Sequence, residues 1–230
     1  MQRLDKILAN ANIGSRSDVK LLVKKGRVAV NGEVILKSEY KVSVEDKICV
    51  DGQAISTEKY VYYMLNKPTG YVSATIDNTA QTVISLLKKE GRNDLFCVGR
   101  LDKDTEGLLL ITNNGEWSHR LLSPKYHVEK TYLVHLKNPI SEGNIKVLEE
   151  GVDIGEKNIT KMAKVEVIEE VKILLTITEG KFHQVKRMLQ AVDNEVIYLK
   201  RVSFGGIKLD EGLNLGEYRR LTQEEVNALT

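Results

Sequence analysis

A series of short strand-like segments fills the chain from about residue 60 onward and limits the folds open to it. These segments are rich in β-branched, aromatic and leucine residues, and several alternate apolar with polar side chains. They cover residues 61–65, 97–102, 107–112, 130–137, 163–169, 172–180 and 196–209. Fewer helical segments separate them, at 81–90, 116–123, 183–192 and 223–229. This pattern predicts an α+β domain with a mainly antiparallel sheet.

The first part of the chain has a different pattern, two short amphipathic helices followed by a hairpin. The first helix is predicted over "RLDKILANANIG", and the second starts at Ser15, where Asp18 three residues later completes a capping box. The segment "VAVNGEV" then places Asn-Gly between alternating valines, which is a strong hairpin signal. We therefore predict a small α/β-hairpin module at residues 1–55, a linker at 53–60 and a second domain at 60–230.

Basic charge is concentrated in the first 27 residues. The chain as a whole has a net charge of +2. Residues 1–27 hold seven basic and two acidic side chains, a net charge of +5, which leaves −3 for the remainder. Because phosphate contacts dominate the affinity of proteins for nucleic acid, this distribution favours a polyanion-binding module. A solvated basic face is the alternative that charge alone leaves open.

Several other protein classes are disfavoured by composition. No apolar run reaches the roughly 20 residues that span a bilayer, and the charged N-terminus does not resemble a signal peptide, so we expect a cytoplasmic protein without a membrane partner. Cys49 and Cys97 lie in apolar segments and are predicted to be free thiols. The four histidines lack partners at ligand spacing, so no metal site and no cofactor are expected.

The segment "GRLDKDTEGLLLIT" places Asp102 and Asp104 in a glycine-flanked turn before a buried strand, and three interpretations compete for it. A calcium loop fails because Asn113 stands where the bidentate glutamate is required. A magnesium-dependent phosphotransfer motif needs a buried strand that leads directly into the first aspartate, and Gly99 and Arg100 interrupt that approach. The third interpretation is a single reactive aspartate at the mouth of a cleft.

Further motifs resemble those of known families. The order of "RLDK", "GSRSD", "KKGRVAVNG" and "DKICVDG" resembles the RNA-binding module named after ribosomal protein S-four. The segments "LNKPTGYVSA", "VGRLDKDTEGLLLITNNG", "SPKYHVEKTYLV" and "EGKFHQVKRML" resemble the pseudouridine synthases, and the combination is similar to the RsuA-type branch. "WSHRLLSP" and "GEYRRLT" resemble the small-subunit, 16S rRNA member. The resemblance implies isomerisation of a uridine, at position 516 for that member.

The resemblance also implies roles for single residues. Asp102 is the expected nucleophile, Tyr132 the tyrosine that lies against the target base, and Lys186 the cation paired with Asp102. Arg100 is expected to enter the RNA stack as the uridine leaves. Asp104 is expected to hydrogen-bond the turn backbone. Whether Asp102 attacks the base or the sugar, or assists elimination, stays open, as does the choice between Lys186 and Arg187 as its partner.

The remaining expectations concern RNA contacts and alternatives. The predicted RNA contacts are Arg3, Ser15, Arg16, Lys24, Lys25, Arg27, Lys67 and Arg187, with Arg187 alternatively in a structural ion pair. Ribosomal RNA within a small-subunit assembly intermediate is the expected partner of a monomeric enzyme. The rival functions are a large-subunit 23S rRNA pseudouridine synthase, a catalytically silent RNA-binding or assembly protein, and a magnesium-dependent aspartate phosphatase or hydrolase.

Overall fold

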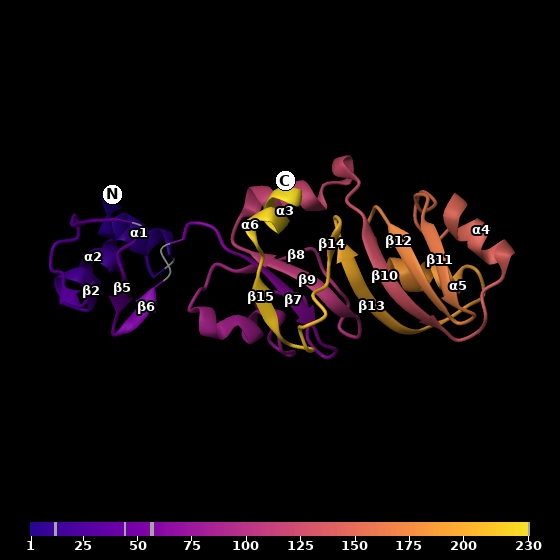
Figure 1. Cartoon of the computed structure of the whole chain (residues 1–230), viewed down its shortest axis with the longest axis horizontal. Helices are drawn as coiled ribbons and strands as arrows, with labels where there is room; N and C mark the ends of the chain where they lie inside the picture. Colours follow the sequence, from indigo (N-terminus) through magenta and orange to yellow (C-terminus); the bar gives the residue numbers. More distant parts are fainter. Residues whose placement is uncertain (12, 44, 56–57, 230) are drawn as a thin grey trace. The chain divides into compact units, whose positions relative to one another are not determined.

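The chain forms two compact units in a computed structural model that describes residues 1–11, 13–43, 45–55 and 58–229 (Figure 1). Unit 1 comprises Met1–Val61 with Lys88–Leu95, and unit 2 comprises Tyr62–Leu87 with Phe96–Thr230. The predicted linker at 53–60 includes residues 56–57, which lie outside the described residues, as does the last residue of the predicted second domain. The sequence did not indicate that residues 88–95 group with unit 1.

Unit 1 packs two helices and short strands around a small apolar core. Its strands pair as a four-stranded antiparallel sheet in the order β3-β2-β5-β6, with β1 and β4 as a separate antiparallel pair. The core gathers valine, leucine and isoleucine side chains from both helices and from the strands. The elements are β1 (Gln2–Arg3), α1 (Leu4–Asn10), α2 (Arg16–Lys24), β2 (Val28–Val30), β3 (Glu33–Val34), β4 (Lys41–Val42), β5 (Ile48–Val50) and β6 (Gln53–Ile55).

Local signals in the sequence define α2 and the hairpin. The capping box is confirmed, because the Ser15 hydroxyl accepts the Asp18 amide at 3.2 Å and the Asp18 carboxylate accepts the Ser15 amide at 3.0 Å. The predicted hairpin turn is confirmed as well, with Asn31 and Gly32 at φ of 53° and 90°. The first helix is shorter than predicted, since α1 ends at Asn10.

The helix α2 presents a basic face. Arg16, Lys20 and Lys24 are four residues apart, so they share one side of the helix, and all three are exposed. The buried residues of α2 are Val19 and Val23, which lie on the adjoining side of the helix. The helix therefore directs its apolar residues into the core and a row of cations into solvent.

Unit 2 is built on a nine-stranded sheet that is mainly antiparallel, as predicted. Seven strands follow the order β11-β12-β10-β13-β9-β7-β15, while β14 pairs with β13 and β8 with β9. The described strands are β7 (Tyr62–Lys67), β8 (Phe96–Val98), β9 (Glu106–Thr112), β10 (Lys130–Leu136), β11 (Lys164–Glu169), β12 (Lys172–Ile177), β13 (Val196–Phe204), β14 (Ile207–Lys208) and β15 (Tyr218–Arg220). Among these named strands the parallel pair is β9 with β13.

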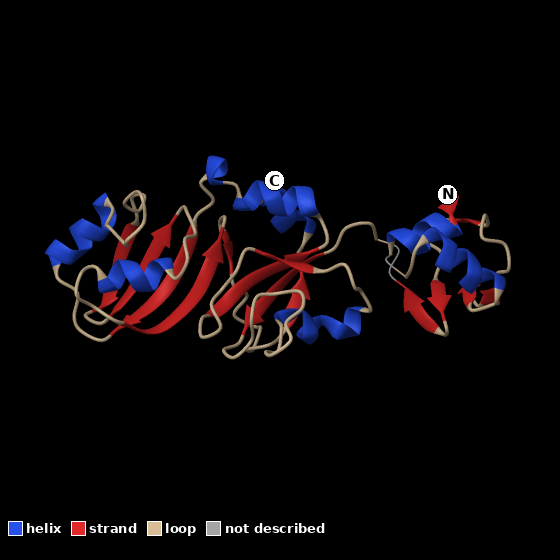
Figure 2. Ribbon diagram, turned by 180° about the vertical axis from the view of Figure 1, so that it is seen from behind, coloured by secondary structure: helices blue, strands red, loops and turns tan. Residues whose placement is uncertain are grey.

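Helices lie beside the sheet at both ends (Figures 1 and 2). The helix α3 contacts β8, α4 contacts β11 and α5 contacts β13. The helices are α3 (Gly115–Leu122), α4 (Glu142–Glu150), α5 (Gln184–Gln190) and α6 (Gln223–Ala228), with 3₁₀ helices η1 (Val83–Glu90) and η2 (Pro124–Tyr126). Two predictions are corrected: the helix at 81–90 is a 3₁₀ helix, and the strand predicted at 97–102 ends at Val98, which leaves Asp102 in a loop.

A close approach of β9 and β13 sets the position of this loop. Gly107 has φ of 99° and lies beside Arg201 in the parallel register. A Cβ atom at Gly107 would lie 2.2 Å from the Arg201 carbonyl oxygen, so glycine is required there. In the described part of the chain no helix is long and apolar enough to cross a membrane.

Candidate active site

Asp102 lies in the loop between β8 and β9, and Ser73 fixes the backbone of this loop. The Ser73 hydroxyl donates to the Leu101 carbonyl at 2.8 Å and accepts from the Leu101 amide at 3.0 Å. The Thr105 amide donates to the Asp102 carbonyl at 3.1 Å and closes the turn before β9. Because the backbone is tied on both sides, the Asp102 carboxylate is presented by an ordered turn. Sequence reasoning missed Ser73, whose signal was its place in "LNKPTGYVSA".

Lys67 supports the same turn, and the prediction that it contacts phosphate is wrong. Lys67 ends β7, and its side chain is fully buried. Its ammonium donates to the carbonyls of Pro68 at 3.0 Å, Thr105 at 2.8 Å and Lys103 at 3.4 Å. Burial lowers the pKa of Lys67 to about 8, an effect that the nearby carboxylates, Asp104 first, partly oppose. Lys67 is therefore a cation that holds the Asp102 turn and does not reach solvent.

This pKa predicts a pH dependence of stability. Between pH 8 and 10.5 the unfolded chain keeps the Lys67 proton that the folded chain releases, so the free energy of unfolding rises with pH. Lys67→Met removes this contribution. We expect urea unfolding to show that the free energy of unfolding of wild type, relative to that of Lys67→Met, rises by about 2 kcal/mol between pH 7 and 10. A difference that stays constant contradicts the account, and the exposed Lys208→Met variant is the control.

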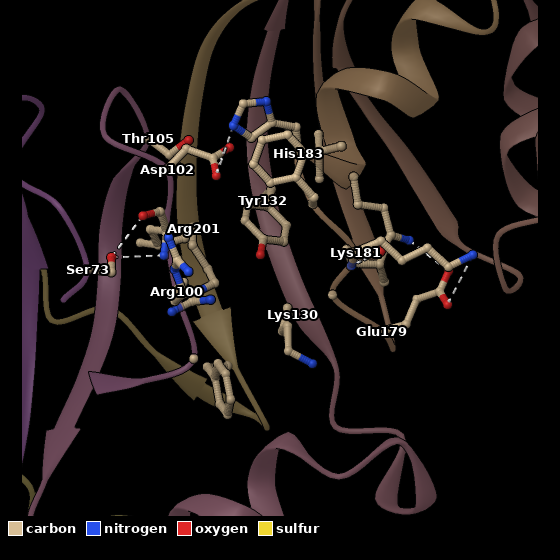
Figure 3. Close-up of a pocket in the computed structure, with 18 of the residues that line it drawn as sticks. Ser73, Arg100, Asp102, Thr105, Lys130, Tyr132, Glu179, Lys181, His183 and Arg201 are labelled. Atoms are coloured by element: carbon tan, nitrogen blue, oxygen red, sulfur yellow. Dashed lines mark hydrogen bonds and ion pairs between the residues drawn. The ribbon is translucent and has the colours of Figure 1, made fainter. Parts of the chain in front are cut away.

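Two basic side chains from the segment around α5, those of His183 and Lys186, lie near the Asp102 carboxylate. His183 Nε2 lies 3.5 Å from Asp102 Oδ1, and Lys186 Nζ lies 3.7 Å from Asp102 Oδ2. The Asp102 side chain is 28% exposed, which keeps it accessible to a ligand. His183 and Lys186 thus reach Asp102 from a segment about 80 positions away along the chain, and Figure 3 shows His183 beside Asp102.

Lys186 binds Asp104 more closely than Asp102. Its ammonium lies 2.6 Å and 2.7 Å from the two carboxylate oxygens of Asp104. This hydrogen bond lowers the pKa of Asp104. Asp104 accepts a backbone hydrogen bond in the turn, as expected, and its carboxylate in addition holds Lys186. Lys186 lies between the two aspartates, and its contact with Asp102 is the longer one.

His183 and Phe182 form the rim beside Asp102. His183 adopts a left-handed backbone conformation, with φ of 48°, immediately before α5. Its ring stacks on Phe182 with centroids 3.8 Å apart and planes inclined by 18°. Phe182 is 72% exposed, an unusual degree for a phenylalanine. No sequence pattern indicated a chemical role for either residue, since the backbone conformation brings them to the rim.

Asp102 opens onto a cavity of about 660 Å³ within unit 2. Tyr132 lines this cavity from β10, where alternate residues are buried as predicted, and its side chain is 8% exposed. Figure 3 shows Tyr132 in the middle of the pocket, between Asp102 and Lys130. This cavity, called the Asp102 pocket below, has the size typical of small-molecule sites.

Arginines of different exposure also line the Asp102 pocket. Arg100 is exposed, two residues before Asp102, in a loop that Gly99 starts with φ of 76°. Arg201 comes from β13 and is 2% exposed, and its Nε donates to the Leu108 carbonyl at 2.7 Å. Arg100 is therefore positioned to meet a ligand at the surface, whereas Arg201 belongs to the interior of the pocket.

Arg187 forms a structural ion pair, the alternative to RNA contact that was expected for it. Its guanidinium donates to Glu156 Oε1 at 2.8 Å, to the Phe182 carbonyl at 3.0 Å and to the Ile154 carbonyl. These contacts tie α5 to the segment around residue 155. The guanidinium is thus occupied by protein groups, and the structure does not favour Arg187 as an RNA contact or as the partner of Asp102.

The predicted RNA contacts of unit 1 differ in whether their side chains already bind other groups of the protein. Arg3 pairs with Asp5 and Arg27 with Asp51, each through two hydrogen bonds between guanidinium and carboxylate. Ser15 caps α2. Of the predicted contacts, Arg16, Lys24 and Lys25 are exposed and have no ion pair with a carboxylate among the described residues, and Lys20 of α2 is exposed beside them. The helix α2 and its C-terminus therefore carry a group of exposed cations.

The donor set of the Asp102 pocket favours covalent or acid-base chemistry by side chains. Within the described residues, no group of three or more histidine, cysteine, aspartate or glutamate side chains is arranged to hold a metal ion. Cys49 and Cys97 are free and half-buried, and burial raises the pKa of the Cys97 thiol to about 12. An ionised Asp102 beside a tyrosine and several cations can attack an electrophilic carbon of a planar, negatively charged ligand.

Comparison with known proteins agrees with this geometry. Residues 61–191 match the RNA pseudouridylate synthase family, and residues 2–48 match the S4 domain. The chain is 50% identical to "Uncharacterized RNA pseudouridine synthase YtzG" of Bacillus subtilis strain 168, over 99% of this chain and 98% of the relative. It is 44% identical to "Ribosomal small subunit pseudouridine synthase A" of Salmonella typhimurium, over 97% and 98%.

A solved structure gives the same result for the whole chain. The "Crystal structure of pseudouridylate synthase" superimposes with a TM-score of 0.72 at 40% identity and covers 100% of both chains. The family match includes the Asp102 turn, Tyr132 and Lys186. This chain therefore belongs to the RNA pseudouridylate synthase family and carries an N-terminal S4 domain.

Proposed function

We propose that this protein isomerises a uridine of small-subunit 16S ribosomal RNA to pseudouridine, with position 516 as the expected target and Asp102 as the nucleophile. The observation that carries the proposal is the Asp102 carboxylate at the mouth of a cationic pocket, with His183 and Lys186 within 3.7 Å. The names of relatives that are 43–44% identical over nearly the full chain support the small-subunit target.

The reaction needs only groups that the chain supplies. The bond between ribose C1′ and uracil N1 breaks, a bond between C1′ and C5 forms, C5 loses a proton and N1 gains one. Substrate and product are isomers, so no electron acceptor or second substrate is consumed. The Asp102 carboxylate forms the transient covalent bond to the nucleotide, and Lys186 stabilises its charge before and after that step.

Other residues orient the nucleotide. Tyr132 lies in the middle of the Asp102 pocket, where its ring packs against the uracil and limits the directions in which the detached base turns. A base in a helix must leave the stack before it can enter such a pocket. Arg100 is exposed beside the pocket, and its planar guanidinium fills the vacated place in the stack.

The two parts of the chain divide the work. We assign RNA binding to residues 1–55 and catalysis to residues 60–230. The exposed cations of α2 support the first assignment, and the Asp102 pocket in unit 2 supports the second. We further propose that the enzyme acts in the cytoplasm as a monomer on a small-subunit assembly intermediate, where rRNA is partly folded and the target uridine is still accessible.

The experiment that tests this function is pseudouridine mapping after incubation of purified protein with 16S rRNA, 23S rRNA and small-subunit assembly intermediates. We expect one modified uridine in 16S rRNA, formed at the same rate with EDTA in monovalent salt that keeps the RNA folded. Modification of 23S rRNA alone overturns the target, and no modification of any RNA favours a silent RNA-binding protein. Activity restored by magnesium at fixed RNA structure contradicts the cofactor-free mechanism.

A further inference from the structure

Two cations in the Asp102 pocket are buried without a counterion. Lys130 starts β10 and is 9% exposed, and Arg201 lies on the adjacent strand β13 and is 2% exposed. The Lys130 ammonium donates to the Val128 carbonyl at 2.7 Å, and Arg201 Nε donates to the Leu108 carbonyl. Neither forms an ion pair with a carboxylate in the part of the chain that the structure describes. Buried charges are normally paired, so this arrangement indicates a missing partner.

The contacts that the two cations do make leave their charge uncompensated. Arg201 Nη2 is buried and has no hydrogen-bond acceptor. Both cations lie over the ring of Phe204, Arg201 at 5.1 Å and Lys130 at 5.3 Å from its centroid. A cation–π contact is favourable, but the ring is neutral and one ring serves two positive charges. An unpaired N–H at this depth is costly unless a ligand accepts it.

The lining of the Asp102 pocket as a whole also has more cations than carboxylates. It has six cationic side chains and two carboxylates, those of Asp102 and Glu179. Burial lowers the pKa of Lys130 to about 8, and the charge of nearby Arg201 adds to this effect while Glu179 opposes it. Glu179 accepts instead from Gln184 at 2.8 Å and lies 3.8 Å from Lys181. The six cations are Arg100, Lys103, Lys130, Lys181, Lys186 and Arg201.

We propose that Lys130 and Arg201 form an anion subsite in the Asp102 pocket that binds a phosphodiester flanking the target uridine. The inference rests on the proposed function for the identity of the ligand. Uracil and ribose are uncharged, so the phosphodiester, with its one negative charge, is the group of a uridine nucleotide that can pair with these cations. An ammonium and a guanidinium N–H are suitable donors for phosphate oxygens.

The geometry gives this subsite a role in positioning. Lys130 and Tyr132 are alternate residues of β10 and share its buried face, and Figure 3 shows Asp102 on the opposite side of Tyr132 from Lys130. A phosphate held at Lys130 and a base held at Tyr132 fix the nucleotide at two points. The ribose then lies between these two points, and the base at Tyr132 is held beside the Asp102 carboxylate, which raises the rate by orientation.

The test measures binding without turnover, so that it is readable even if the protein does not isomerise uridine. NMR titration of the full chain compares uridine, uridine 5′-monophosphate and uridine 3′-monophosphate as probes. Wild type should bind one monophosphate at least about tenfold more tightly than uridine, as expected for charge-assisted hydrogen bonds. Lys130→Met should abolish that ratio, Lys130→Arg should keep most of it, and Lys208→Met, which removes an exposed lysine of β14, should leave it unchanged.

Two results would overturn the subsite. One is equal binding of all three probes by wild type. The other is an unchanged ratio in Lys130→Met; if both affinities fall equally, Lys130 contacts the base. A second arm changes the ligand and needs no variant to fold: a trinucleotide with a central uridine carries an uncharged methylphosphonate at one of its two linkages. Wild type should bind one of the two methylphosphonate trinucleotides about tenfold more weakly than the unmodified trinucleotide. Equal binding of all three trinucleotides contradicts the subsite. Absence of pseudouridine formation with an intact ratio would reject the proposed function alone.

Discussion

Asp102→Asn should lower the single-turnover rate of pseudouridine formation by at least about 10³-fold while RNA binding and folding survive. Asparagine keeps the size of the side chain but cannot form the covalent bond that the carboxylate forms. The turn itself depends on backbone groups and on Ser73 and Lys67, none of which the substitution removes. The measurement is pseudouridine formed per enzyme on a single 16S rRNA substrate, with RNA affinity measured in parallel.

Asp104→Asn is the matched control, because it neutralises a carboxylate two residues away. Asp104 holds the Lys186 ammonium at 2.6 Å, whereas Asp102 lies 3.7 Å from it. The amide accepts a weaker hydrogen bond and leaves Lys186 free to approach Asp102, so we expect a loss of no more than about tenfold. An active Asp102→Asn enzyme, or an Asp104→Asn enzyme that is folded and equally inactive, would show that the roles of the two carboxylates are misassigned.

Neutralising the exposed cations of α2 should weaken RNA binding about 100-fold, since exposed ion contacts contribute up to about 1 kcal/mol each. The variant replaces Arg16, Lys20 and Lys24 of α2, together with its C-cap residue Lys25, by glutamine. Each lost phosphate contact should also reduce the slope of log affinity against log salt by about 0.7 to 0.9, so the total reduction is about 3. The side chains are exposed, and unfolding should therefore change little.

A control of equal charge separates this effect from the net charge of the protein. Lys146, Lys157, Lys164 and Lys208 are exposed lysines of unit 2, and their replacement by glutamine removes the same four charges. We expect that variant to keep nearly the wild-type affinity and salt slope. If the two variants lose affinity and slope equally, α2 is not a specific RNA surface.

Sequence reasoning succeeded where the deciding forces are local. The capping box at Ser15 and Asp18 depends on residues three positions apart, and Asn31 with Gly32 sets a turn without help from the rest of the fold. The alternation along β10 likewise follows from one buried face. The rival patterns for the Asp102 segment demand neighbours that the sequence lacks, and the prediction that Asp102 is the nucleophile rests on the family resemblance.

It failed where the deciding contacts come from distant segments. The segment around Lys67 resembles a solvated turn, but carbonyls from residues 103 and 105 surround its ammonium and bury it. Lys186 was assigned by order of motifs, and that order does not reveal that Asp104 lies nearer than Asp102. The buried state of Lys130 and Arg201 depends on the pairing of β10 with β13, which no local pattern specifies.

The central claim is tested most directly in cells that lack the gene for this protein. Pseudouridine is mapped across 16S and 23S rRNA after complementation with wild type, with Asp102→Asn or with an empty vector. We predict one 16S uridine that is modified with wild type and unmodified in the other two strains. A modification that persists in the empty-vector strain, or returns with Asp102→Asn at equal protein abundance, would contradict it.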